Sequence, residues 1–276
     1  MLMRLKSKAN FFRAKAAQTI GRLSFSKTVL SPVESRIFNQ LESDGGAVTS
    51  LRELSLEFNE DLQTEIAALF SDISPAEKGR RKQYAQHASL EQIAAVPGVL
   101  LWGLNESLLN IVGAYLRQAP RFRGVVARID RANGIQEETR LYHLDAEDFR
   151  IIKIIVYIND IGPEDGPFSF IPKRLTPSLS RLKFTNNRVL DEDMAKFVPQ
   201  SDVHVCTGPA GTVIFVDTCS VLHRGNVGVA NDRHALFYAY NTKHPLRPQY
   251  CLPLYEPKTL LAHLISLSPI QLDAIA

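Results

Sequence analysis

The sequence lacks any long hydrophobic run. None of its apolar stretches approaches the roughly 18 residues that a membrane-spanning helix requires. Hydrophobic residues make up 45% of the chain and charged residues 22%, proportions that exclude both an integral membrane protein and a disordered one. The 276 residues are enough for one large catalytic domain with a substantial core.

Cysteine is scarce as well. Cys206, Cys219 and Cys251 are an odd number, and they show no CxxC spacing. A disulfide framework and a zinc knuckle are therefore both disfavoured. This usage is typical of a reducing compartment, and we predict a cytoplasmic location with an option of membrane association.

Acidic residues are absent before Glu34, whereas seven bases precede it. The remainder of the chain has 25 bases and 29 acids, a net charge of −4. The small positive charge of the whole chain therefore belongs to its N-terminal segment. A slightly acidic body lacks the basic face that nucleic-acid binding requires, and we predict no nucleic-acid partner.

Residues 1–30 have the pattern of a basic amphipathic helix, separate from a single catalytic domain at 31–276. Apolar residues recur at roughly helical spacing, at Leu2, Leu5, Phe12, Ala16, Ile20 and Leu23. Three interpretations remain open: a helix docked on the domain, a peripheral membrane contact through residues 1–27, and a cleaved transit peptide. The apolar residues are too scattered for a secretory signal.

Helix signals dominate the first part of the catalytic domain. Ser31, Pro32 and Glu34 form a capping-box pattern that predicts a helix to about Ser43. A turn at 44–46 then precedes a short strand at 47–48, and residues 60–118 are mostly helical in pattern.

From residue 123 the hydrophobic period changes from 3.6 to 2, which indicates strands. We expect them at 124–131, 141–145, 150–159, 168–171, 203–206, 212–217 and 235–240, separated by turns rich in Gly and Pro. Many short strands after a helical region predict an α+β fold. Its core would be a jelly roll, that is, a cupin-like double-stranded β-helix, with N-terminal helices packed on it.

His143 and Asp145 are the first candidate metal ligands. Residues i and i+2 of an extended segment point to one face, so an imidazole and a carboxylate at this spacing can bind one ion. The pattern alone is weak, but His223 follows the strand 212–217 where a jelly roll would bring a third ligand. Two histidines and one carboxylate leave positions open on iron(II) for a bidentate 2-oxo acid and O2.

Two basic residues are candidates for holding the cosubstrate. Arg233 begins an apolar strand, and a guanidinium that points inward from it needs an anion, for which the distal carboxylate of 2-oxoglutarate is suited. Lys153 lies within the apolar run 151–155 and would be costly to bury without a counter-ion. It is the second candidate for that carboxylate, or for an acidic group of the substrate.

The segment 120–245 resembles the phytanoyl-CoA dioxygenase family of iron(II)/2-oxoglutarate oxygenases. The similarity lies in Tyr142-His143-Leu144-Asp145, in the strand and Gly-Pro turn between 156 and 172, in the segment 208–225 that contains His223, and in the spacing to Arg233. Two positions depart from the family pattern: Pro172-Lys173-Arg174 stands where many relatives have Gly-Ser-His after the proline, and Ala235 where a serine often assists the cosubstrate.

The resemblance implies a dioxygenase that uses Fe(II), 2-oxoglutarate and O2. It would hydroxylate a small-molecule, lipid or glycan-type substrate and release succinate and CO2. Two alternatives stay open: a non-catalytic binding module with the same jelly-roll fold, and a membrane-associated structural protein that acts through its N-terminal segment. Substrate selectivity is expected in the loops 173–200 and parts of 75–100.

Overall fold

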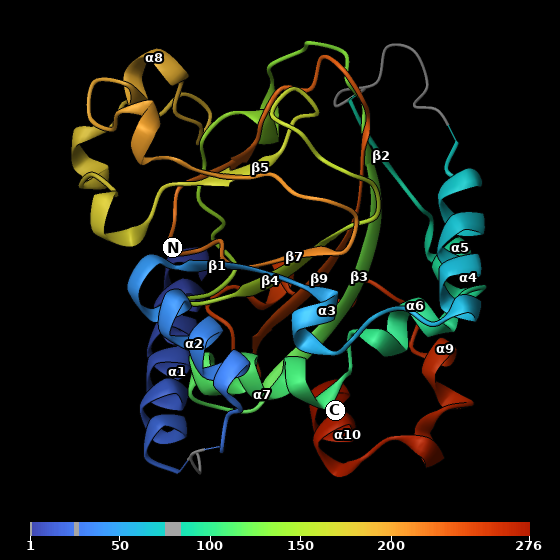
Figure 1. Ribbon diagram of the computed structural model, residues 1–276. Helices are drawn as coiled ribbons and strands as arrows, with labels where there is room; N and C mark the ends of the chain where they lie inside the picture. The colour runs from blue at the N-terminus through green and yellow to red at the C-terminus, as the bar shows by residue number, and fades with distance from the viewer. Residues whose placement is uncertain (1, 25–27, 75–83) are drawn as a thin grey trace.

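The computed structural model describes residues 2–24, 28–74 and 84–276, and it contains two antiparallel sheets (Figure 1). The larger sheet has the order β1 (Gly46–Ser50), β7 (Thr212–Asp217), β4 (Ile152–Tyr157), β9 (Arg233–Thr242), β3 (Pro120–Asp130) and β2 (Ala85–His87). The smaller has the order β6 (His204–Cys206), β5 (Phe168–Phe170) and β8 (His223–Gly225). The predicted combination of helices with an antiparallel sheet is confirmed.

Helices cover one face of the larger sheet. They are α2 (Pro32–Asp44), α3 (Leu51–Leu54), α4 (Glu60–Ser71), α5 (Leu90–Ala94), α6 (Pro97–Trp102), α7 (Glu106–Leu116), α9 (Lys258–Leu261) and α10 (Pro269–Ile275). Two others, α1 (Leu2–Ser24) and α8 (Asp191–Met194), lie at the margins. The other face of this sheet packs on the smaller sheet, so the two faces have different environments.

Strand β4 shows how the alternation of side chains divides these two environments. Ile152, Ile154 and Val156 belong to the core beneath the helices, whereas Ile155 and Tyr157 belong to the core between the sheets. Lys153 shares its face with the second group because successive residues of a strand point to opposite sides. The inner face of an apolar strand therefore carries one lysine.

The first helix of the main domain begins at the predicted capping box. Ser31 caps α2 in a capping box with Glu34, and Pro32 is the first helical residue. The helix ends at Gly45, whose φ of 77° is in the left-handed region that favours glycine. Gly46 then opens β1 directly against the ring of Phe170, where a Cβ would lie 2.4 Å from the ring.

Two sequence predictions differ from the structure. The strand expected at 141–145 is reduced to isolated bridges of Tyr142 with Val189 and of His143 with His223, because the two partners, one in a loop and one in β8, are not parts of a single strand. The region 60–118 is helical apart from β2, whose three residues are too short to show a period and which forms by pairing with β3. The stretch 75–83 within that region lies outside the described residues.

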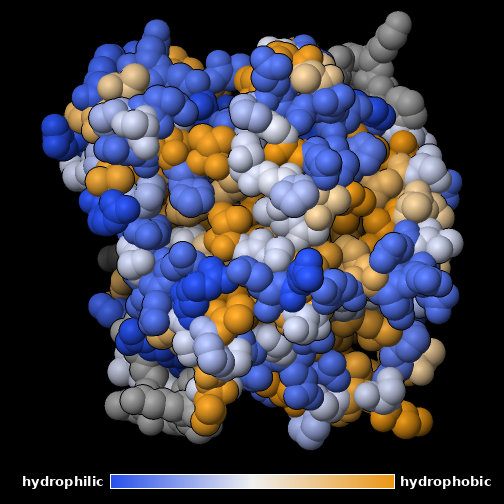
Figure 2. Space-filling view, viewed as in Figure 1, coloured by the Kyte–Doolittle hydropathy of each residue, from blue (hydrophilic) through white to orange (hydrophobic). Residues whose placement is uncertain are grey.

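The N-terminal helix α1 makes contact with the domain. Ala14 is fully buried, and the ring of Phe11 meets that of Phe149 with centroids 5.5 Å apart. These contacts favour the interpretation that the helix is docked on the domain. Phe12 and Ile20 are exposed, and the membrane contact stays a prediction. Among the described helices none is long and apolar enough to cross a membrane. On the face seen in Figure 2, hydrophobic residues are interspersed with hydrophilic ones.

We predict that deletion of residues 1–27 leaves the chemistry of the domain unchanged and reduces binding to anionic vesicles. The deletion removes all seven N-terminal bases and leaves a body of net charge −4, which anionic lipid repels. Co-sedimentation with phosphatidylserine vesicles measures the change, and neutral vesicles are the control. Undiminished binding by the truncated protein would assign the membrane contact elsewhere.

Candidate functional site

His143, Asp145 and His223 come together at the edge between the two sheets. One potential ligand atom of each lies within 4.8 Å of the others, and both histidines are buried. His143 and Asp145 lie on the extended segment that follows the short 3-10 helix η1 (Glu138–Arg140), and His223 is the first residue of β8. Two segments 80 residues apart in sequence thus supply one ligand cluster.

The main chain holds the two histidines in register. The His143 amide donates to the His223 carbonyl and the His223 amide donates to the His143 carbonyl, both at 3.1 Å. The Asp145 amide donates to the Thr218 carbonyl at 2.9 Å. Since these bonds use only backbone atoms, they fix the relative positions of the three residues along the main chain independently of the side chains.

Hydrogen bonding also determines which imidazole nitrogens are available. Nδ1 of His143 lies 2.9 Å from the Leu141 carbonyl, and Nδ1 of His223 lies 3.0 Å from the Val221 carbonyl. A carbonyl can only accept, so each Nδ1 carries the proton and each Nε2 keeps its lone pair. Nε2 of His223 lies 3.9 Å from Oδ2 of Asp145.

The protonation states suit a metal ion. Burial lowers the pKa of both histidines, that of His143 well below its ordinary value and with a further contribution from His223. Burial would raise the pKa of Asp145, but Lys153 and the two histidines lower it. Neutral imidazoles and an ionised carboxylate are the forms that coordinate metals. The donor set therefore fits a divalent cation that accepts nitrogen and oxygen ligands.

Lys153 is the ion-pair partner of Asp145, through contact of Nζ with Oδ2. Burial lowers the pKa of Lys153, but Asp145 and Glu147 together outweigh burial, and the pKa is raised. A charged partner beside a ligating carboxylate fixes the orientation of that carboxylate. Lys153 therefore meets a protein carboxylate, whereas the sequence suggested a cosubstrate or a substrate.

A cavity of about 130 Å³ joins all five residues that the sequence singled out. Its lining includes His143, Asp145, His223, Lys153 and Arg233, with Arg128 beside them. Arg233 stands on the inner face of β9, and apolar groups from Ile155, Phe168 and Phe237 complete the wall. A ligand in this cavity would touch both the histidines and the guanidinium.

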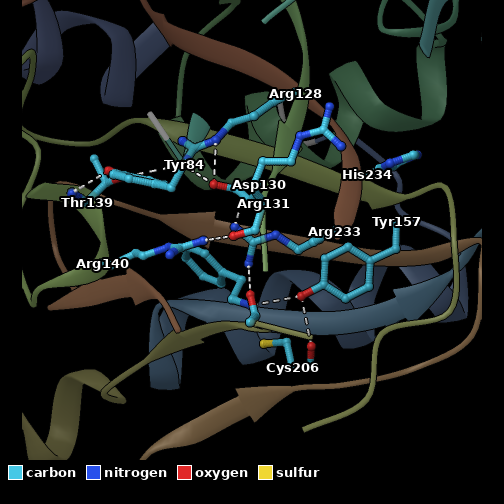
Figure 3. Close-up of polar contacts among 12 residues, drawn as sticks. Tyr84, Arg128, Asp130, Arg131, Thr139, Arg140, Tyr157, Cys206, Arg233 and His234 are labelled. Carbon is cyan, nitrogen blue, oxygen red and sulfur yellow. Dashed lines mark hydrogen bonds and ion pairs between the residues drawn. The ribbon is translucent and has the colours of Figure 1, made fainter. Parts of the chain in front are cut away.

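The guanidinium of Arg233 is paired with Asp130, which the sequence analysis missed. Nη2 donates to Oδ2 of Asp130 at 2.7 Å, Nη1 donates to the Gly166 carbonyl, and Nε has no partner among the described residues. Asp130 also accepts from Arg128 (Figure 3). Burial opposes ionisation of Asp130, but Arg128 and Arg233 lower its pKa to about 2. The signal in the sequence is the alternation Val126-Ala127-Arg128-Ile129-Asp130, which puts two charges on one face of β3.

Comparison with known proteins finds similarity in structure only. No family model matches the sequence, and no curated protein matches it. A structure of EctD from S. alaskensis with bound Fe superposes with a TM-score of 0.57 at 18% identity, covering 86% of each chain. HygX from Streptomyces hygroscopicus, solved with nickel and 2-oxoglutarate, gives 0.53 at 15% identity, covering 78% of this chain and 88% of that one.

A third neighbour is an epimerase. SnoN, described as a non-haem α-ketoglutarate-dependent epimerase from nogalamycin biosynthesis, gives a TM-score of 0.52 at 12% identity, covering 75% of this chain and 80% of that one. At such identities the likeness shows a shared fold. The chemistry has to be argued from this chain's own residues.

Proposed function

We propose that this protein is an iron(II)- and 2-oxoglutarate-dependent oxygenase that hydroxylates a small molecule, with a double-stranded β-helix formed by its two sheets. One observation carries the proposal: His143, Asp145 and His223 present two imidazole Nε2 atoms and a carboxylate to one point, in a cavity that also contains Arg233. Neighbours of the same fold were solved with iron, or with nickel and 2-oxoglutarate. The resemblance to the phytanoyl-CoA dioxygenase family points the same way.

In this proposal each residue has a defined task. His143, His223 and Asp145 hold iron(II), and Lys153 orients the Asp145 carboxylate. Arg233 receives the distal carboxylate of 2-oxoglutarate through the N–H groups that Asp130 and Gly166 leave free. Ile155, Phe168 and Phe237 exclude water from the reacting groups. When bound, iron(II) with 2-oxoglutarate and O2 supplies the oxidation of a C–H bond, and succinate and CO2 are released.

The decisive test is conversion of 2-oxoglutarate to succinate by the purified protein with iron(II), ascorbate and a cell extract. We expect O2 consumption and succinate formation that stop when iron is omitted. A protein without this turnover would instead be a binding module of the same fold. The experiment therefore distinguishes the oxygenase from the non-catalytic binding module; the third interpretation, a membrane-associated structural protein, predicts lipid binding without any dependence on metal.

We predict that the product gains one oxygen atom and no chlorine. Asp145 fills the ligand position that a halide would have to occupy, so chloride has no place at the metal. Mass spectrometry of the extract before and after incubation in chloride buffer measures this. A chlorinated product would contradict the prediction. A product of unchanged mass would indicate an isomerisation, the class of reaction that an epimerase such as SnoN catalyses.

A further inference from the structure

The buried region beside the histidines contains more positive than negative charge. Asp130 is in the field of three guanidiniums, those of Arg128, Arg140 and Arg233 (Figure 3). Arg140 is buried and donates to neutral acceptors, the carbonyls of Arg131 and Ile135 and the side chain of Asn133. One carboxylate therefore faces three cations.

A second cavity, of about 210 Å³, extends this region away from the histidines. It shares Arg128, Lys153 and Phe237 with the first cavity, so the two adjoin at these side chains. Its far end is lined by Arg123 and Glu147. A small molecule that reaches the histidines from this side meets both Arg123 and Arg128.

Arg123 is aimed into this cavity by an irregularity in β3. The register with β9 shifts between Phe122 and Gly124, so Arg123 is an extra residue of a β-bulge. Gly124 has a φ of 118°, and a Cβ there would lie 2.8 Å from the ring of Tyr255. The Arg123 guanidinium donates to the carbonyls of Tyr250 and Leu252, at 2.7 and 3.3 Å. Its only described carboxylate contact is with Glu147, at 3.8 Å.

The charges can be counted over both cavities and the cluster behind them. The described residues provide five cations, Arg123, Arg128, Arg140, Lys153 and Arg233, and three carboxylates, Asp130, Asp145 and Glu147. The excess is therefore two positive charges. Iron(II) and the 2-oxoglutarate dianion cancel each other, so this excess persists in the loaded protein. An excess of this size among buried and half-buried side chains is unfavourable unless a ligand neutralises it.

We propose that the substrate is a small acid whose anionic group, a carboxylate or a phosphate, binds between Arg123 and Arg128. The inference rests on the proposed function for its reaction, and on the two adjoining cavities for its geometry. Lys153 is paired closely with Asp145, whereas Arg128 shares Asp130 with Arg233. Arg123 contacts Glu147 only at 3.8 Å. The two arginines are therefore the less neutralised cations of the second cavity and the groups that recognise the anion. The rest of the substrate then extends through the first cavity toward the histidines. Cavities of this size admit a small molecule.

The test is calorimetric titration of the full chain, loaded with nickel(II) and saturating 2-oxoglutarate, with sodium acetate and separately with inorganic phosphate. We expect one of the two anions to bind saturably, and Arg128→Gln and Arg123→Gln each to weaken it at least about tenfold. Arg52→Gln removes an exposed arginine outside both cavities and should have no effect. Circular dichroism verifies the fold of each variant.

The two anions distinguish a carboxylate from a phosphate group. Absence of saturable binding by the wild type, or undiminished binding in both folded variants, would overturn the proposal. Titrations of metal and of 2-oxoglutarate are done first, and they test the proposed function separately from the anion site. The anions are also titrated into the metal-free protein. The anion site is therefore tested even if the protein fails to bind 2-oxoglutarate. In the extract assay, a product formed from the fraction that an anion exchanger does not retain would overturn the substrate class.

Discussion

Replacement of His223 by alanine, or of His143 by alanine, is expected to reduce 2-oxoglutarate turnover to the level of a protein-free control. Each change removes one of the three proposed ligands, and the remaining pair would leave a metal without the facial arrangement that two histidines and a carboxylate provide. Succinate formation measures the loss of turnover, and metal content after dialysis measures the loss of iron.

The fold should survive both replacements, because the bonds that join the two positions are backbone bonds. We expect a loss in the free energy of unfolding of about 1–3 kcal/mol from the cavity left by a buried side chain. His263→Ala, in the loop after α9, is the matched control and should keep full turnover. If either variant still decarboxylates 2-oxoglutarate, the replaced histidine is not a metal ligand.

Arg233→Ala is expected to raise the concentration of 2-oxoglutarate required for half-saturation about a hundredfold, equivalent to about 3 kcal/mol. The change removes a buried guanidinium from the cavity and leaves Asp130 with its ion-pair partner Arg128 and with Arg140 nearby. Calorimetry with nickel(II) in place of iron measures cosubstrate affinity directly, without turnover. Iron affinity should be preserved, because no described contact joins Arg233 to the three ligands.

Lys153→Met and Arg36→Ala are the companion variants. Lys153 orients Asp145, so its loss should weaken metal binding as well as reduce 2-oxoglutarate affinity to a smaller degree than Arg233→Ala does. Arg36 pairs with Glu53 on the surface, and its replacement should change neither affinity. An Arg233→Ala protein that binds 2-oxoglutarate as the wild type does would show that Asp130 fully occupies the arginine and that another cation holds the cosubstrate.

How far the sequence predicts the site depends on the range of the interactions. The capping box at Ser31 and Glu34 is local, so its pattern was sufficient. The pair His143 and Asp145 is nearly local, because i, i+2 spacing puts both side chains on one side of any extended segment, even where the strand is reduced to bridges. The predictions of the capping box and of the ligand pair both rest on residues that lie within three positions of each other in the sequence.

The partner of Arg233 could not be predicted in the same way. Asp130 lies opposite it only because β3 pairs with β9 in one particular register, 103 residues apart. The bulge that aims Arg123 is set by contact of Gly124 with Leu254 and Tyr255, which are more distant still. A single sequence shows that such charges need partners, but it does not show which ones they find.

Arg123 donates hydrogen bonds to the carbonyls of Tyr250 and Leu252, which lie close to the C-terminal end of the sequence. Tyr250 and Leu252 follow His223 by roughly 30 residues, so at the usual rate of about 5–20 residues per second they are synthesised a few seconds after it. The wall around Arg123 is therefore the last part of the two cavities to be synthesised.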